Sequence, residues 1–266
     1  MGVGKGIVSY PHLGANGRLG NCLFQVATTV AYALDHDKNY LFPEWSHSKF
    51  LRTPLPEGVL DGPRTGFTEP SFSFSPIPAI SGNVELLGYY QSWRYFDHHR
   101  EPILKLFELR PDIEAYVQHE SLILMKRRDR MCSIHVRRGD YLSNPETNAY
   151  HGIPPIEYYM DAVEHLYGTN SKKVLFHIFS DDPQYCKDSF GFLHNTVFSE
   201  GQQDIVDMYL MACCQDHIIA NSSFSYWGSY LSQYKDKRIV APKRWFTGAN
   251  APQDTKDLYL PKTIIL

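Results

Sequence analysis

The sequence predicts an α/β fold with a mostly parallel sheet in its C-terminal half. From residue 131 onward, short apolar runs that do not alternate with polar residues are separated by segments with a helical pattern. Continuous apolar runs are typical of strands covered on both faces, and an intervening helix is the usual crossover between parallel strands. The hydrophobic fraction of 43% excludes a disordered chain.

The N-terminal half is more irregular. We expect a strand at 6–10, a glycine-rich loop at 14–21, and a helix over 22–39 because its apolar residues recur at helical spacing. Residues 43–83 hold many of the prolines, which predicts loops and short strands there.

A further strand is expected to begin near Val84, followed by helical sequence over 99–128 that is interrupted near Pro111. Beyond it the pattern of the second half begins. We therefore place an N-terminal domain at 1–128 and a C-terminal domain at 129–266.

The second half contains five expected strands and four expected helices, the last of which begins at about Phe224. The strands are predicted at 131–136, 173–180, 194–199, 216–221 and 238–242. The helices between them are predicted at 153–168, 183–190 and 203–214.

The bulk properties narrow the class of protein. A formal net charge of −3 argues against a nucleic-acid-binding protein. The five cysteines show no CxxC pair and no ligand spacing with histidine, so we expect reduced thiols rather than disulfides or a zinc site. No signal peptide is recognisable, and no apolar run approaches the ~18 residues of a membrane span. These features favour a soluble, cytoplasmic protein.

Polar residues follow three of the expected strands. "HVRRGDY" occupies 135–141, "FSDDP" occupies 179–183 and "ANSSFS" occupies 220–225. The carboxyl ends of parallel strands meet at one edge of a sheet, where open α/β sheets bind their ligands. We expect these three segments to form one site.

The two arginines of the first segment suit an anion such as phosphate. Successive side chains of an extended backbone point to opposite sides, so Arg137 and Arg138 should have different tasks. We expect one to contact the ligand and the other to pair with a carboxylate such as Asp140. The alternative is a pair of structural salt bridges.

The third segment predicts a helix start. Ser222 or Ser223 should cap a helix that begins at about Phe224, leaving backbone N–H groups that attract phosphate. The alternative is an ordinary capped helix, and Tyr226 and Trp227 are expected in the core.

The acidic residues of the second half indicate a function less clearly than the arginines do. Asp181 could accept hydrogen bonds from sugar hydroxyls or a proton from an acceptor alcohol, whereas Asp182, before a proline, is typical of a turn or helix start. Asp207 is expected on the solvated face of a helix, and His177 in the core. In the "GRLGN" loop, Arg18 and Asn21 could approach an anion, although the loop lacks dinucleotide or P-loop spacing.

Taken in series, several motifs make the chain resemble glycosyltransferase family 11, the α-1,2-fucosyltransferases. The motifs are "GRLGNCLFQVA" (17–27), "YYQSWRYF" (89–96), "HVRRGDY" (135–141), "FSDDP" (179–183), "DMYLMACCQDHIIANSSFSYWGSYL" (207–231) and "VAPKRWF" (240–246). The resemblance implies a GT-B-like fold, with two Rossmann-like domains facing each other across a donor cleft. It implies GDP-β-L-fucose as donor, a galactose-containing acceptor glycan, inversion, and no required metal or other cofactor.

The resemblance also implies roles for individual residues. The catalytic set would be Arg137, Asp140 and Asn21. The donor-binding set would be Arg18, Gly20, His135, Arg138, Asp181, Asp207, Asn221, Ser222, Ser223 and Phe224. Two alternatives remain open: a transferase of the same fold for another nucleotide sugar, and a catalytically silent carbohydrate-binding homologue.

Overall fold

The computed structural model describes residues 5–139, 144–249, 251–252 and 254–266. The chain divides into two compact units, Met1–Ile113 with Asp254–Tyr259, and Glu114–Gln253 with Leu260–Leu266. The division predicted from the sequence, at residue 128, follows the end of helix α3 (Pro111–Met125). The division by contacts falls after Ile113, near the start of the same helix. We describe each unit by itself.

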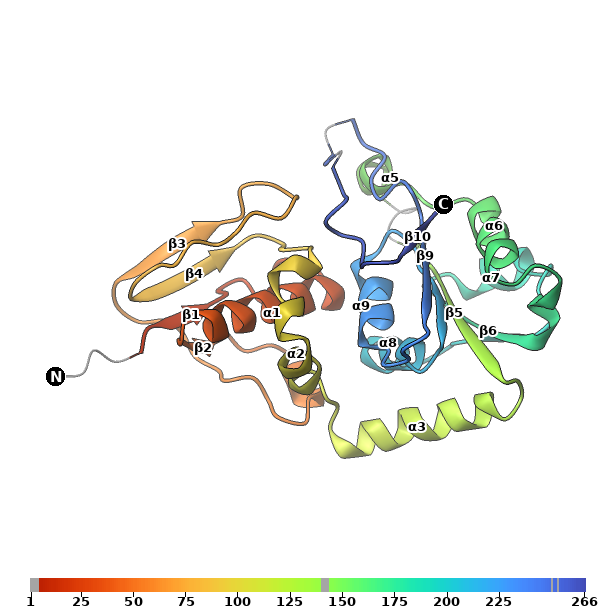
Figure 1. Cartoon of the computed structure of the whole chain (residues 1–266), viewed down its shortest axis with the longest axis horizontal. Coiled ribbons are helices and arrows are strands. Elements are labelled where there is room, and N and C mark those ends of the chain that lie inside the picture. The colour runs from red at the N-terminus through yellow and green to blue at the C-terminus, as the bar shows by residue number, and fades with distance from the viewer. Residues whose placement is uncertain (1–4, 140–143, 250, 253) are drawn as a thin grey trace. The chain divides into compact units, whose positions relative to one another are not determined.

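The first unit contains a four-stranded parallel sheet in the order β2-β1-β4-β3 (Figure 1). Its strands are β1 (Ile7–Ser9), β2 (Asn39–Leu41), β3 (Arg64–Thr68) and β4 (Asn83–Leu87). Its helices are α1 (Leu19–Asp35) and α2 (Arg100–Leu106), with short 3₁₀ turns at η1 (Ser48–Phe50), η2 (Trp93–Tyr95) and η3 (Asp97–His99).

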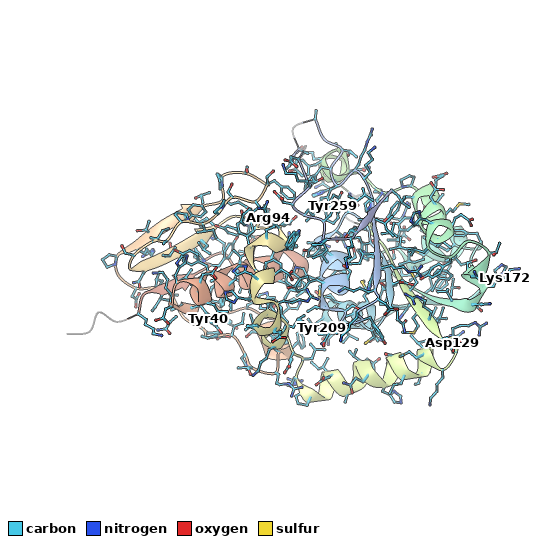
Figure 2. All side chains as sticks on the ribbon, in the orientation of Figure 1. Tyr40, Arg94, Asp129, Lys172, Tyr209 and Tyr259 are labelled. Atoms are coloured by element: carbon cyan, nitrogen blue, oxygen red, sulfur yellow. The ribbon has the colours of Figure 1, made fainter. Side chains whose placement is uncertain are left out.

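A C-terminal segment completes the first unit. Arg94, labelled in Figure 2, pairs with Asp257 at 2.9 Å, and the Ser92 hydroxyl donates to the Asp257 carbonyl at 2.7 Å. Because these contacts join residues more than 160 positions apart, a division of the chain at one point in the sequence does not capture the unit.

The second unit contains a six-stranded parallel sheet in the order β10-β9-β8-β5-β6-β7. Its strands are β5 (Arg130–Val136), β6 (Val174–Ser180), β7 (Thr196–Phe198), β8 (Asp216–Ile218), β9 (Arg238–Ala241) and β10 (Ile264–Ile265). Its helices, with α3, are α5 (Pro145–His151), α6 (Ile156–Tyr167), α7 (Pro183–Ser189), α8 (Asp204–Ala212) and α9 (Ser223–Leu231); η4 (Gly168–Lys173) precedes β6.

The α/β prediction and the parallel sheet are confirmed. Six of the seven residues of β5 are buried, as its unbroken apolar run requires. The helical segment near Pro111 is interrupted as expected, since α2 ends at Leu106 and α3 begins at Pro111, a position that favours proline. The edge strand β10, only two residues long, was not predicted.

Other core expectations also agree with the structure. Tyr226, Trp227 and His177 are buried. All five cysteines are free thiols, four of them buried and Cys213 half-buried. Within the described part of the chain, the helices are too short or too polar to cross a membrane.

One buried carboxylate joins the central strands at their N-terminal ends. Asp216, at the start of β8, is fully buried and accepts from Arg130 Nε and Nη2 at 2.5 and 2.8 Å. It also accepts from Arg238 Nε and Nη2 at 3.0 and 2.7 Å and from the Tyr167 hydroxyl at 2.5 Å. Burial alone would raise the pKa of Asp216, but the hydrogen bonds from Arg130, Arg238 and Tyr167 hold it well below its ordinary range.

We expect Asp216→Asn to lower the free energy of unfolding by about 2–3 kcal/mol, because Arg130 and Arg238, which are about one third exposed, lose the buried charge that they share. The Asp216 contribution should be present at neutral pH and lost as the pH falls below the ordinary carboxyl range, since its folded pKa is depressed. Urea unfolding at pH 7 and pH 2.5 measures both effects.

The matched control is Asp236→Asn. Asp236 pairs with the same Arg130 at 3.3 Å but is 70% exposed, so its loss should cost less than about 1 kcal/mol. Equal, small effects of the two substitutions would contradict the central role of Asp216.

Candidate functional site at the carboxyl edge of the second sheet

The order of strands in the second sheet reverses between β5 and β8. From β5 the chain proceeds through β6 to β7 on one side, and then through β8 and β9 to β10 on the other. Such a switch point leaves a crevice at the carboxyl ends of the two strands, which is where open α/β sheets bind ligands. The segments after β5 and β8 are the predicted "HVRRGD" and "ANSSFS" motifs.

Arg137 directly follows β5 and pairs with Asp181, which follows β6. Its Nη1 lies 2.6 Å from Asp181 Oδ2, and the two side chains are 16% and 24% exposed. The other oxygen of Asp181 accepts from the Arg138 backbone N–H at 2.8 Å. A Cβ at Gly139 would lie 2.9 Å from Asp181 Oδ2, so the loop after β5 packs closely against this carboxylate.

These contacts give Asp181 a structural task, while its expected donor-binding role stays a prediction. Both of its carboxylate oxygens are engaged by the loop after β5, so the residue orients Arg137. The sequence could not indicate this pairing, because the two residues belong to different strands.

Arg138 has a separate set of partners, as the alternation of side chains predicts. Its Nε lies 3.2 Å from Asp182 Oδ2, and its guanidinium carbon lies 3.4 Å from the centre of the Tyr185 ring. Asp182 also caps α7 by accepting from the Tyr185 backbone N–H at 3.1 Å, which confirms its predicted place at a helix start. The carboxylate that holds Arg138 is thus Asp182, while Asp140 lies outside the described residues.

His135 is buried, and its ring centre lies 5.4 Å from that of Phe224, in the first turn of α9. Burial and the charge of Arg137 lower the pKa of His135 to about 3, against a smaller opposing effect of Asp181. The imidazole is therefore neutral at neutral pH. Its Nδ1 atom is buried without a hydrogen-bond partner in the described part of the chain.

The helix α9 begins where it was predicted to begin. Ser222 is its N-cap, and the Ser222 hydroxyl accepts from the Phe224 backbone N–H at 3.3 Å. Ser223 and Phe224 are half-buried in the first turn. The contact of Phe224 with His135 brings the first turn of α9 next to the end of β5.

Asn221 has a structural task, and its expected donor-binding role stays a prediction. It is 2% exposed, and its Nδ2 donates to the carbonyls of His151, Gly152 and Trp245 at 2.8, 3.2 and 3.1 Å. It therefore joins the segments around these residues. Only long-range contacts reveal this role.

Asp207 is not on a solvated face, so that expectation was wrong. It lies half-buried in the first turn of α8 and accepts from the Ser199 hydroxyl at 2.5 Å, just beyond β7. Burial raises its pKa to about 6, although the Ser199 hydrogen bond acts in the opposite direction. Helical periodicity could not reveal Ser199, which belongs to another segment.

Three expected site residues belong to the first unit. Arg18 is the N-cap of α1 and Gly20 is buried in its first turn. Asn21 accepts from Gln91 Nε2 at 2.8 Å, which ties the "GRLGN" loop to the "YYQSWRYF" motif. Gly17 has a φ of +95°, and a Cβ there would lie 2.2 Å from Asn21 Nδ2, so this turn requires glycine.

Sequence reasoning missed the contribution of Glu69. Its Oε2 accepts from the backbone N–H groups of Tyr89 and Tyr90 at 2.8 and 2.9 Å, and Tyr90 has a left-handed φ of +52°. Burial raises the pKa of Glu69 to about 6. The carboxylate thus holds the "YYQ" turn that presents Gln91 to Asn21, and no local pattern around Glu69 signals it.

Comparison with known proteins supplies the family. A model described as glycosyl transferase family 11 matches residues 76–263. The O-antigen biosynthesis glycosyltransferase WbnK of Escherichia coli is 33% identical over 66% of this chain and 59% of its own length. An α-1,2-colitosyltransferase of Escherichia coli is 38% identical over 63% and 58%. A galactoside 2-α-L-fucosyltransferase of Bos taurus is 27% identical over 83% and 64%. The alignments thus span about three fifths of the length of these relatives.

Solved structures share the fold at low sequence identity. The fucosyltransferase NodZ from Bradyrhizobium has a TM-score of 0.57 and 15% identity over 85% of this chain and 92% of its own. The fucosyltransferase POFUT1 in complex with GDP has a TM-score of 0.53 and 10% identity over 86% and 96%. These similarities confirm the predicted GT-B-like α/β fold class. Because the family model covers more than half of its residues, the chain belongs to glycosyltransferase family 11.

Proposed function

We propose that the protein transfers L-fucose from GDP-β-L-fucose to a galactose hydroxyl of a glycan, forming an α-1,2 linkage with inversion. Family membership supports the proposal, as do relatives named galactoside α-1,2-fucosyltransferases. The observation that carries it is the place of Arg137 at the switch point, two residues after His135, whose ring contacts the first turn of α9.

This arrangement suits a diphosphate leaving group. As the sugar–oxygen bond breaks, negative charge develops on GDP and positive charge on the sugar. A guanidinium offers five N–H donors in one plane, so Arg137 can bind phosphate oxygens while Asp181 fixes its orientation. The N-terminal N–H groups of α9 add a second stabilising element. Donors fixed in advance stabilise the departing anion without reorganisation.

The neutral state of His135 fits the same role. The neutral imidazole leaves the charge of the diphosphate to Arg137, and together with Phe224 it forms an aromatic surface. We propose that this surface lies next to the nucleoside of GDP.

The acceptor hydroxyl must lose a proton as it attacks the sugar. Asp181 is a poor base while it is paired with Arg137, because the guanidinium stabilises its ionised form. We therefore propose Asp140 as the residue to test for this role. We also propose that the residues of the first unit expected to bind the donor, Arg18, Gly20 and Asn21, complete its binding.

Removal of the Arg137 guanidinium tests the proposal directly. Arg137→Ala should lower the turnover rate by about 10²–10³, comparable with the loss of one oxyanion donor. The assay is transfer from radiolabelled GDP-fucose to lactose. Arg128→Ala is the control, since Arg128 is bonded to Asn195 away from the switch point. Near-normal turnover by a folded Arg137→Ala protein would refute the assignment.

Asp207 is proposed to accept hydrogen bonds from the guanine base in its ionised form. Asp207→Asn should weaken GDP binding by about 10–100-fold, because a hydrogen bond to a charged acceptor contributes ~1.5–3 kcal/mol. Since burial raises its pKa to about 6, the protonated fraction increases as the pH falls through 6, and GDP affinity should decline there.

Isothermal titration at pH 7.5, 6.0 and 5.0 measures this dependence. The terminal phosphate of GDP titrates near pH 6 as well. Asp207→Asn keeps that phosphate, so the difference between wild type and variant isolates the carboxylate. Asp188→Asn is the control, since Asp188 is exposed and bonded to Gln184. Identical pH profiles for wild type and Asp207→Asn would exclude the role.

A nucleotide panel tests the donor class. GDP at a hundred times its Kd should stabilise the protein by about 2.7 kcal/mol in thermal unfolding, while UDP and CMP should have little effect. We further propose that transfer requires no metal, so activity should survive EDTA. Loss of activity with EDTA, or equal stabilisation by UDP, would contradict these proposals.

A second candidate is transfer of colitose, favoured by the 38% identity to an α-1,2-colitosyltransferase. Competing GDP-fucose and GDP-colitose in one assay and comparing kcat/KM decides between the two sugars. Glycan binding with neither GDP release nor GDP affinity would instead indicate a silent carbohydrate-binding homologue.

A further inference from the structure

Two consecutive histidines meet one carboxylate in the first unit. Asp35 is the last residue of α1, and His98 and His99 belong to η3. His98 Nε2 lies 3.1 and 3.0 Å from the two Asp35 oxygens, and His99 Nε2 lies 2.8 Å from Oδ1. One ligand atom from each residue lies within 4.8 Å of the others.

The geometry of these atoms is close to that of a metal site. Bonds of about 2.0–2.1 Å in a tetrahedral site place neighbouring donor atoms roughly 3.3 Å apart. The distances of 2.8–3.1 Å between nitrogen and oxygen therefore need to lengthen by only a few tenths of an ångström, and the two nitrogens, which lie within 4.8 Å of each other, need to reach the same spacing. The two rings, with centres 4.5 Å apart and planes tilted by 48°, direct their Nε2 atoms to the same carboxylate.

The location also favours a cation. The C-terminal end of a helix carries partial negative charge, and the last turn of α1 contains Asp35 but no basic residue. The side chains of His98, Asp35 and His99 are 47%, 38% and 28% exposed. An ion could therefore enter from solvent, and water could fill the remaining coordination positions.

We propose that Asp35, His98 and His99 form a binding site for a divalent transition-metal ion, with Zn²⁺ as the best match. Two imidazole nitrogens and one carboxylate suit Zn²⁺, Ni²⁺ or Cu²⁺, whereas Mg²⁺ and Ca²⁺ prefer oxygen ligands alone. The ion would join the end of α1 to the segment before α2, 63 residues later. It would stabilise the first unit and take no part in sugar transfer.

The test uses the full chain, without a histidine tag and after treatment with chelator. Titration with Zn²⁺ should give one bound ion per chain, and Zn²⁺ at a hundred times its Kd should raise Tm by roughly 5–10 °C. Mg²⁺ at the same concentration should have no effect. Asp35→Asn, His98→Ala and His99→Ala should each weaken Zn²⁺ binding at least tenfold.

The matched control is His119→Ala. His119 also lies beside a carboxylate, Glu120 at 3.3 Å, but its pair lacks a second histidine, so this substitution should leave Zn²⁺ binding unchanged. Co²⁺ bound to wild type should show visible absorption that disappears in His99→Ala, which tests the ligands even if a variant is less stable. Absence of stoichiometric binding, or equal Zn²⁺ affinity in wild type and all three ligand variants, would overturn the proposal.

Discussion

The second unit depends on the burial of one charge. Asp216 begins β8 and holds Arg130, which begins β5, and Arg238, which begins β9. A buried carboxylate is tolerated only where charged donors surround it, so these three strands must start side by side. In the parallel pairing of β5 and β8, Cys132 lies beside Asp216 and Ile134 beside Ile218, so the same constraint brings the carboxyl end of β8 next to the last residues of β5, where the order of the sheet reverses.

The two ends of the sheet therefore use ion pairs differently. At the amino ends, two arginines share one fully buried carboxylate, Asp216, and their effect is structural. At the carboxyl ends, Arg137 and Arg138 each pair with a separate, partly exposed aspartate of the next strand's loop. Such pairing fixes the direction of a guanidinium before any anion arrives. An apolar strand interior separates these two layers of charge, so each can be altered with limited effect on the other.

The predictions from the sequence were correct where they depended on residues close together in the chain, and they failed where they depended on distant residues. The start of α9 and the Asp182 cap depend on neighbouring residues, and both were predicted correctly. The separate tasks of the two arginines also follow from local backbone alternation. The surroundings of Asp207 and Asn221 were not predicted, because they depend on Ser199 and on carbonyls up to seventy positions away. The pairing of Asp181 with Arg137 was not predicted either, because the two residues follow different strands.

The path of the chain has a further consequence for how the units are held together. Residues 114–253 belong to the second unit, 254–259 return to the first, and 260–266 return to the second again, ending in β10. The backbone therefore passes from one unit to the other three times. A protease that cut once within the middle of α3 would leave both fragments anchored, since the tail around Asp257 would still be held by Arg94. Two domains joined by one linker are separated by a single cut, whereas these two units are not.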